Sequence, residues 1–425
     1  MSNGKKLLVL DTSYTLEIIK ERQLYEPVLS RDLNGYFDHV WSVHPYATVI
    51  PPKNESETYG EIVTTQFSER HTIMEGKIGR FRLLKKAAFI NFILSQIDVL
   101  ITLYRLIKKE KILVIRATDS NYVGFLGLLL SRLHRIPLVV RVTANHDKFY
   151  EATGRPTMPR LFRKRWIEKC VENFVLKRTD LTAGANEDSR DFAIKSGARK
   201  EYTTVFRYGN LIHPAHRVSP DERPFADLFL RELGLTDTPF VISIARLEAI
   251  KRQDHVLKAI AEINKRGKKL KAVLVGDGSM KSFLIELAKD MHIGNEIIFV
   301  GNKDQKWIAT ILPHAVAVLS PHSGRALSEA ALAGVPIVAY DFEWQSELIK
   351  TDETGELVEN NDVHGMVDAV IKYLDNPDYA KRMGENVRAR ALEMMNPEKL
   401  YEHERNEYEK VFVRYYKQKG DGETI

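Results

Sequence analysis

The segment from Ser320 to Asp341 joins two expected strands through a turn and a short helix. An apolar run, AVAVLS, ends at Ser320 and predicts a buried strand, while GRALSEAALAG supplies good helix formers between an entry glycine and an exit glycine. Pro336 then opens a second apolar run, PIVAYD, which predicts the next strand. The sequence therefore predicts a strand, a loop, a helix and a strand in succession.

The first turn of this helix contains residue types that can hold an anion. Unpaired amide groups and a partial positive charge at the N-terminus allow Ser323, Gly324 and Arg325 to bind a group such as a diphosphate. One turn further on, Glu329 can reach a ribose. An ordinary crossover helix with a surface glutamate explains the segment equally well when it is taken alone. The candidate residues of this anion site are His322, Ser323, Gly324, Arg325, Ala326, Leu327 and Glu329.

Two basic residues follow another expected strand. In the sequence VISIARLEAIKRQD, Arg246 stands just after the strand and Lys251 stands at the approach to the next helix. Two fixed cations beside a diphosphate-binding turn can neutralise the charge that develops on a leaving phosphate. A pair of surface charges without a ligand is the alternative interpretation.

Polar residues also stand at the ends of other expected strands, where ligands bind in open α/β sheets. Gly276 and Asp277 lie in a Gly-Asp-Gly sequence, which is also a good turn, and Asn302 ends a further strand. In the first half of the chain, His146 follows PLVVRV and can donate hydrogen bonds to sugar hydroxyls or move protons near neutral pH. A loop histidine with local hydrogen bonds is the alternative. The first strand lacks the Gly-rich turn of a dinucleotide site, so no bound NAD or FAD is expected.

The elements that must position these residues alternate along the whole chain. Short apolar strands separated by helical patterns predict parallel sheets covered by helices on both faces. The segment from Leu211 to Phe225 carries three prolines among mixed charges and is expected to be a linker. We therefore predict an α/β fold with two doubly wound, Rossmann-like domains. The expected limits are 1–215 for the first domain, 225–395 for the second, and 396–425 for a C-terminal helix that packs back on the first.

The composition is that of a globular protein that meets anionic partners. The chain has 425 residues, 44% of them hydrophobic, a net charge of +6 and a sequence pI near 9.0. The single cysteine, Cys170, excludes an intrachain disulfide and favours a reducing, cytoplasmic compartment. No zinc-ligand set, helix-turn-helix or aromatic RNA-binding pattern accompanies the charge, so nucleic acid is not an expected partner.

Two basic segments of the first domain have apolar faces. Residues 77–112 are apolar over much of their length with basic residues at both ends, and residues 160–178 predict a basic amphipathic helix. Either segment can lie on an anionic membrane surface, which implies peripheral contact with the inner face of the cell membrane. Core helices with a solvated rim of lysine and arginine are the alternative.

The combination of these motifs resembles the retaining glycosyltransferases of family four, which have the GT-B fold. The string ISIARLEAIKRQD is similar to the family's Arg-x4-Lys clamp, and SGRALSEAALAGVPIVAYD is similar to its donor-binding helix and following strand. The resemblance implies a hexosyltransferase-type enzyme that binds a nucleoside-diphosphate sugar in its second domain and a saccharide acceptor on its first. It assigns the diphosphate to Arg246 and Lys251, the ribose to Glu329 and the cleft histidine to His146. No metal or other cofactor is expected.

One position departs from the family's pattern. The first glutamate of the Glu-x7-Glu motif falls on Pro321, so the residue that would contact the donor sugar is missing, and His322 or Arg325 is a hypothetical substitute. Two alternative functions stay open: a nucleotide-sugar epimerase of the same fold, and a non-catalytic nucleotide-sugar-binding partner of a transferase. The basic, apolar segments favour a lipid-linked saccharide acceptor, as in cell-surface polysaccharide synthesis.

Overall fold

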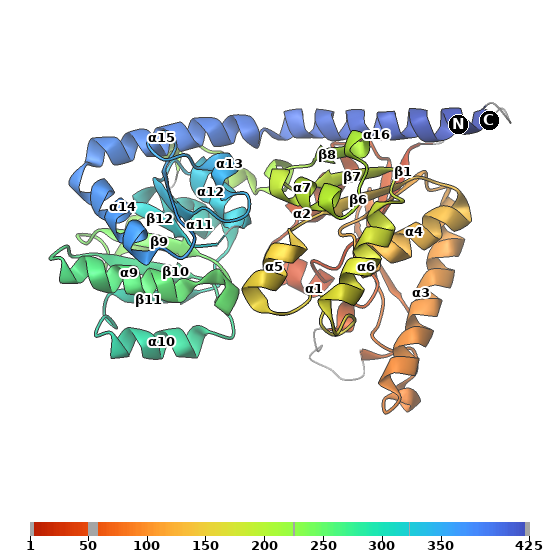
Figure 1. Cartoon of the computed structure of the whole chain (residues 1–425), viewed down its shortest axis with the longest axis horizontal. Helices are drawn as coiled ribbons and strands as arrows, with labels where there is room; N and C mark the ends of the chain where they lie inside the picture. The colour runs from red at the N-terminus through yellow and green to blue at the C-terminus, as the bar shows by residue number, and fades with distance from the viewer. Residues whose placement is uncertain (1–3, 50–57, 224–225, 323, 421–425) are drawn as a thin grey trace. The chain divides into compact units, whose positions relative to one another are not determined.

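The computed structural model of the chain describes residues 4–49, 58–223, 226–322 and 324–420. The chain divides into two compact units, the first made of residues 1–210 with 397–425 and the second of residues 211–396 (Figure 1). Each unit is a parallel α/β sheet with helices on both faces, as the alternating pattern predicts. The central strands, such as β1 and β9, are buried on both sides and consist of nearly continuous apolar residues.

The first unit contains an eight-stranded sheet in the order β3-β4-β2-β1-β5-β6-β7-β8. All neighbouring strands are parallel except β3, which pairs with β4 as an antiparallel edge hairpin that the sequence did not predict. The strands are β1 (Lys6–Leu10), β2 (His39–His44), β3 (Val63–Ser68), β4 (His71–Glu75), β5 (Val114–Ala117), β6 (Leu138–Val142), β7 (Leu181–Gly184) and β8 (Thr203–Val205). The helices are α1 (Leu16–Glu21), α2 (Glu26–Leu29), α3 (Ala88–Glu110), α4 (Tyr122–His134), α5 (His146–Thr153), α6 (Arg165–Leu176), α7 (Glu187–Lys195) and α16 (Pro397–Gly420).

The second unit contains a six-stranded, all-parallel sheet in the order β11-β10-β9-β12-β13-β14. One apolar core lies on each face of this sheet. The strands are β9 (Phe240–Ile244), β10 (Lys271–Val275), β11 (Ile297–Gly301), β12 (Ala317–Ser320), β13 (Ile337–Tyr340) and β14 (Glu356–Val358). The helices are α8 (Asp227–Glu232), α9 (Gln253–Lys265), α10 (Lys281–Asp290), α11 (Gln305–Ile311), α12 (Arg325–Leu332), α13 (Gln345–Leu348), α14 (Val363–Asp375) and α15 (Pro377–Met394).

The expected linker folds as part of the second unit. Residues 211–223 form short 3₁₀ turns, as the prolines indicate, but Ile212 belongs to the core of this unit. The guanidinium of Arg223 donates hydrogen bonds to the carbonyls of Ala309 and His216, at 2.6 and 2.8 Å. These contacts attach an irregular segment to the body of the unit, so composition alone gives the wrong interpretation of it.

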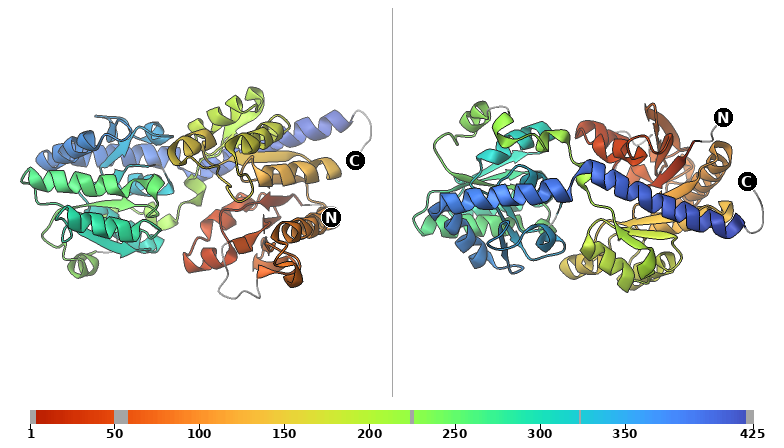
Figure 2. Two further views of the ribbon diagram at one scale, coloured as in Figure 1. Left: turned by 60° about the horizontal axis from the view of Figure 1, so that its bottom comes forward. Right: turned by 90° about the horizontal axis from the view of Figure 1, so that it is seen from above.

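Helix α16 closes one face of the first sheet (Figure 2). Tyr408 and Val411 are fully buried and pack with the apolar side chains of β1, β2, β5 and β6. The ring of Tyr408 meets Phe37 edge to face, with centroids 5.1 Å apart. One turn earlier, Glu404 lies 3.6 Å from the buried guanidinium of Arg116, which compensates both charges. The amphipathic spacing of α16 is therefore what completes this core.

Replacing Val411 by alanine tests how much this face contributes to stability. Val411→Ala removes two buried methyl groups and leaves a cavity, so we expect the free energy of unfolding to fall by about 1–3 kcal/mol. The matched control is Val413→Ala on the same helix, where the side chain is 50% exposed and the expected change is within about 0.5 kcal/mol. Urea unfolding curves measure both. Equal effects of the two variants would contradict the packing role assigned to α16.

Candidate functional site

The candidate site of the second unit is built at the carboxyl ends of its strands, where β10, β9, β12 and β13 lie next to one another. The loops that follow β9 and β10 are joined by their backbones: Ala245 donates to the carbonyl of Val275 and Leu247 to that of Asp277, both at 3.0 Å. Gly276 has φ +137, and a Cβ there would lie 2.0 Å from the carbonyl oxygen of Ala245. Only glycine fits this approach, which fixes the loop that carries Arg246.

The two predicted cations differ in how they are held. Arg246 is exposed; its carbonyl accepts the amide of Glu248 at 2.8 Å, but its guanidinium makes no hydrogen bond or ion pair with a residue that the structure describes. The Nζ atom of Lys251 donates a hydrogen bond of 2.9 Å to Nδ1 of His322, at the end of β12. Burial lowers the pKa of Lys251 to about 8; the nearby Glu343 carboxylate opposes this and the positive charge of Arg246 adds to it. Lys251 and Arg246 thus form a pair of neighbouring cations at one edge of the sheet.

Helix α12 begins beside these cations. Gly324 occupies its N-cap position in an extended conformation and provides no side-chain cap. Glu329 is only 3% exposed, and its Oε1 atom accepts a hydrogen bond of 3.1 Å from Nε of Arg325. Its other carboxylate oxygen has no hydrogen bond to a described residue. The predicted Ser323 lies outside the described residues.

Not every residue predicted from α12 presents its side chain to this edge. The side chain of Leu327 is buried in the core, and its amide already donates to the carbonyl of Gly324 at 3.2 Å. Leu327 is therefore corrected from a binding residue to a core residue, since its side chain follows the apolar stripe of the helix. Ala326, next to it, keeps a partly exposed position in the first turn.

Of the turn residues after β10 and β11, Asp277 and Asn302 are exposed and Gly276 is half-buried, but Asp277 already has partners. Its carboxylate accepts the amide of Gly278 at 2.8 Å and lies 3.1 Å from Nζ of Lys281, and these contacts lower its pKa. Asp277 thus shapes the turn, in keeping with the alternative weighed for the Gly-Asp-Gly sequence. Asn302 is exposed without a hydrogen bond to a described side chain.

Two residues after β13 belong to the site and were missed by sequence reasoning. The side-chain amide of Gln345 is completely buried; its Oε1 accepts from Ser320 Oγ at 2.8 Å and its Nε2 donates to the carbonyl of Tyr340 at 2.7 Å. It thereby ties the ends of β12 and β13 together. Glu343 has φ +54 and lies near enough to Lys251 to influence its pKa. Their position just after the predicted strand PIVAYD was the available signal.

His146 lies in the first unit and does not present its ring to open space. It is 1% exposed, with Nε2 3.0 Å from Oδ2 of Asp119 and Nδ1 2.6 Å from Oε1 of Glu172. Burial alone would lower the pKa of His146, but the two carboxylates outweigh it and raise the pKa to about 10. The expectation of a ring facing substrate is therefore wrong for this structure, because both nitrogens are engaged. His146 instead holds Asp119, whose backbone has φ +152 at the end of β5.

Comparisons with known proteins relate this architecture to sugar-transferring enzymes. Residues 227–390 match the model of the family described as glycosyl transferases group 1. The chain is 27% identical over 273 residues to an alpha-D-kanosaminyltransferase of Streptomyces kanamyceticus, covering 63% of this chain and 69% of that protein. It is 25% identical to the UDP-Gal:alpha-D-GlcNAc-diphosphoundecaprenol alpha-1,3-galactosyltransferase of Escherichia coli, covering 67% and 72%.

Solved structures share the fold over nearly the whole chain. Anabaena HepE in complex with UDP matches with a TM-score of 0.70 at 16% identity, covering 96% of this chain and 100% of that one. The sucrose-phosphate synthase of Thermosynechococcus elongatus matches with a TM-score of 0.72 at 16% identity, with the same coverage. At these identities the similarity establishes the fold of both units.

Replacing His146 tests its role as a buried cation. Because its pKa in the folded protein is raised above the usual 6.5, its stabilising effect is complete below pH 6.5 and is lost as the pH rises through about 10. We expect His146→Asn to lower the free energy of unfolding at pH 7 by about 3–5 kcal/mol, since the buried carboxylate of Asp119 loses its cation while Glu172 keeps Arg165 as a partner. We also expect it to flatten the fall in stability between pH 7 and pH 10.

The matched control is His292→Asn, at an exposed residue with φ +58 that asparagine tolerates. Thermal unfolding midpoints across this pH range measure both variants. An unchanged pH dependence in His146→Asn would refute the buried imidazolium.

Proposed function

We propose that the chain is a glycosyltransferase of the family described as glycosyl transferases group 1, whose model matches residues 227–390, and that it transfers a sugar with retention from a nucleoside-diphosphate sugar to a saccharide acceptor. The observation that carries the proposal is the pair of cations Arg246 and Lys251 at the carboxyl edge of the second sheet, beside the N-terminus of α12. Such a pair suits a doubly charged leaving group.

The proposed binding mode follows from the positions of the polar groups. The donor diphosphate would lie between Arg246, Lys251 and the first turn of α12, where amide groups and the helix dipole favour negative charge. The carboxylate oxygen of Glu329 that Arg325 does not contact would accept hydrogen bonds from the ribose. Gly276 lets the loop after β10 approach Ala245 closely, which would hold Arg246 in position beside the diphosphate. Arrival of the diphosphate would raise the pKa of Lys251 and keep it protonated.

The proposed chemical step needs no protein nucleophile. The bond from the sugar's anomeric carbon to the phosphate oxygen breaks, and the acceptor hydroxyl bonds to that carbon from the same face. The hydroxyl proton passes to an oxygen of the departing diphosphate. Arg246 and Lys251 stabilise the charge on the leaving group, a task that a divalent metal performs in other enzymes, so we propose that transfer is metal-independent.

Pro321 leaves the donor sugar without the expected carboxylate. Of the two hypothetical substitutes, His322 is the better placed, because Nε of Arg325 is engaged by Glu329. With Nδ1 accepting from the ammonium of Lys251, the neutral imidazole carries its proton on Nε2, which can donate to a sugar hydroxyl. A histidine N–H in place of the family's carboxylate would favour a nucleotide sugar whose sugar offers an oxygen lone pair at this position.

Removing either cation tests the donor site. We expect Arg246→Ala and Lys251→Ala each to slow acceptor-dependent release of nucleoside diphosphate by about 10²–10³-fold, since each loses a charge that stabilises the transition state. The assay screens UDP- and GDP-sugars, with and without acceptor.

The matched control is Lys258→Ala, which removes a surface cation of α9 that pairs with Asp254, and full activity is expected. Unchanged release in Arg246→Ala would overturn the proposal. Conversion of the nucleotide sugar into its epimer without an acceptor would indicate an epimerase. Neither conversion nor transfer with any donor would indicate a binding protein.

The acceptor is proposed to be a lipid-linked saccharide presented at an anionic membrane surface, on the cytoplasmic side. Supporting this, an exposed segment before α3, together with the first turn of α3, carries both apolar and basic side chains. Leu83 is 96% exposed and Phe89 76% exposed. The members of this apolar-basic patch are Phe81, Arg82, Leu83, Lys85, Lys86, Phe89 and Ile90.

Helix α3 itself is long and apolar enough to cross a bilayer by length and composition, the one such helix among the described residues. One face of α3, however, is buried: Val99, Leu103 and Ile107 pack in the core of the first unit. We therefore propose that α3 lies against the membrane surface and does not span it. The name of the Escherichia coli relative, which includes a diphosphoundecaprenol acceptor, supports an acceptor of the same kind.

Charged substitutions in the patch test the membrane contact. We expect the double variant Leu83→Glu with Phe89→Glu to bind vesicles of phosphatidylglycerol and phosphatidylcholine at least tenfold more weakly, because it loses apolar burial and adds charge repulsion. The matched double variant is Leu228→Glu with Phe283→Glu in the second unit, at side chains 65% and 50% exposed. Sedimentation with vesicles measures both. Equal vesicle binding by the two double variants would refute the proposal that the apolar-basic patch contacts the membrane.

A further inference from the structure

Helix α6 is oriented with charged side chains inward and apolar side chains outward. Arg165, Glu168 and Glu172 are at most 9% exposed, and the guanidinium of Arg165 lies 2.9 Å from Glu168 Oε2 and 2.8 Å from Glu172 Oε2. On the opposite face, Trp166 is 64% exposed and Phe174 is 44% exposed. An amphipathic helix of a globular protein normally has the reverse orientation, with its apolar stripe toward the core. The outer face of α6 is therefore an apolar surface that the described part of the chain leaves uncovered.

Helices α3 and α4 extend this surface. The three helices lie side by side on one face of the first sheet and contribute to the same core (Figures 1 and 2). On α3, the polar side chains of Asn91 and Ser95 are buried, while isoleucines are exposed. The rings of Phe125 on α4 and Phe174 on α6 lie 6.4 Å apart. We call this surface the three-helix face; its centre is formed by Ile97 and Ile101 of α3, Phe125 and Leu129 of α4, and Trp166 and Phe174 of α6.

The exposed charges of these helices, and of the residues that immediately flank them, are basic. No exposed position within α3, α4 or α6 carries a carboxylate. Lys108 and Lys109 end α3, Arg132 lies on α4, and Cζ of Arg178 lies 3.9 Å from the centroid of the Phe174 ring. An apolar surface with a basic rim complements an anionic lipid surface. Two such faces from two copies of the chain would repel each other.

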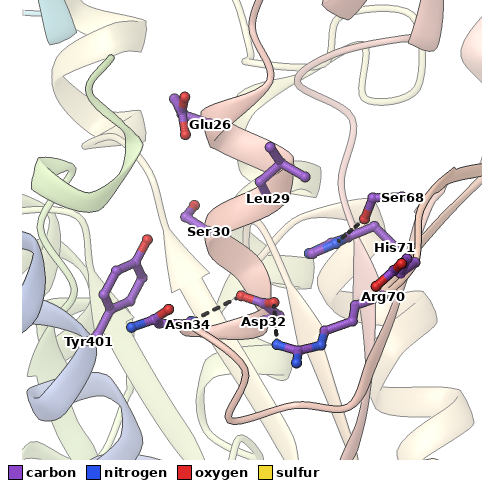
Figure 3. Close-up of a pocket in the computed structure, with 10 residues that line it drawn as sticks. Glu26, Leu29, Ser30, Asp32, Asn34, Ser68, Arg70, His71 and Tyr401 are labelled. Carbon is purple, nitrogen blue, oxygen red and sulfur yellow. Dashed lines mark hydrogen bonds and ion pairs between the residues drawn. The ribbon is translucent and has the colours of Figure 1, made fainter. Parts of the chain in front are cut away.

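The surface of the first unit near β4 is different. Figure 3 shows a hollow of about 390 Å³ there, lined mostly by polar side chains. Nη1 of Arg70 lies 3.6 Å from Oδ2 of Asp32, and Nδ1 of His71 lies 2.8 Å from Oγ of Ser68. Polar side chains of this kind are satisfied by one another and by water. The apolar side chains of the three-helix face gain stability only when an apolar phase covers them.

We propose that the first unit rests on an anionic bilayer through the three-helix face, with Trp166 and Phe174 inserted at the boundary between headgroups and acyl chains. Tryptophan and phenylalanine are the side chains that favour this depth. The contact proposed for the apolar-basic patch involves only one end of α3, whereas this surface spans three helices and therefore sets the orientation of the unit.

The orientation has a consequence for the acceptor. With α3, α4 and α6 against the lipid, the first sheet lies parallel to the membrane and one layer of helices away from it. Because a helix with its side chains is about 10–12 Å across, the carboxyl edge of the sheet is held about that far above the acyl chains. This part of the inference rests on the proposed lipid-linked acceptor, whose saccharide would reach the carboxyl edge from the side.

Cys170 allows a direct test, since it is the only cysteine of the chain and is exposed on α6 between Trp166 and Phe174. A nitroxide attached to Cys170 is measured for collisions with a water-soluble nickel complex and with oxygen, with and without vesicles of phosphatidylglycerol and phosphatidylcholine. We expect vesicles to lower the nickel collision rate about fivefold and to raise the oxygen rate, because the label enters the acyl boundary. The matched control combines Cys170→Ser with Phe283→Cys in the second unit, and its label should stay in water.

The double variant Trp166→Glu with Phe174→Glu gives a second readout. It should bind the vesicles about tenfold more weakly or worse, because it loses apolar burial and adds negative charge. Its thermal midpoint should be unchanged, since both side chains are exposed. The double variant Leu228→Glu with Phe283→Glu is again the control.

Three results would overturn the inference, and each has a different meaning. A label that stays in water on vesicle-bound protein would exclude the three-helix face and leave the contact at the apolar-basic patch standing. A dimer in solution that Trp166→Glu with Phe174→Glu dissociates would identify a second copy as the partner. No vesicle binding at all would exclude both membrane contacts without bearing on the assays of the donor site.

Discussion

A parallel sheet brings the carboxyl ends of all its strands to one edge, and the functional part of this molecule depends on that constraint. In the second unit it gathers Arg246, Lys251, His322 and Glu343 from the ends of three strands. Backbone contact at Gly276 and the buried amide of Gln345 then fix the loops between them. These contacts fix the positions of the charged groups relative to one another, which is what electrostatic stabilisation of a leaving group requires.

The charged side chains discussed above are buried and paired in the first unit but more exposed in the second. In the first unit, the buried side chain of His146 pairs with both Asp119 and Glu172. These charges therefore stabilise the conformation of the loop after β5. In the second, Arg246 stays exposed without an ion pair to a described residue, and Lys251 is partly desolvated beside it. Neighbouring like charges destabilise a folded protein, and an anionic ligand relieves the repulsion.

Local patterns predicted the parts of the molecule that local sequence determines. Arg246, Lys251 and α12 were predicted because their chemistry lies within a few residues of a strand end. His146 was placed at the correct strand end, but its partners Asp119 and Glu172 are 27 and 26 residues away, and only tertiary packing brings them together. The linker interpretation of residues 211–225 failed for the same reason, since Arg223 finds its carbonyl partners through the fold.

Helix α16 has a consequence for how the protein is made. Lys5 and Glu409 form an ion pair across 404 residues of sequence, and the apolar face of β1, β2, β5 and β6 remains uncovered until Tyr408 and Val411 emerge from the ribosome. Translation of residues 211–396 intervenes, which takes roughly 10–40 s at ordinary elongation rates. The first unit to be synthesised is thus the last to be completed, and chaperones have that interval in which to shield its open face.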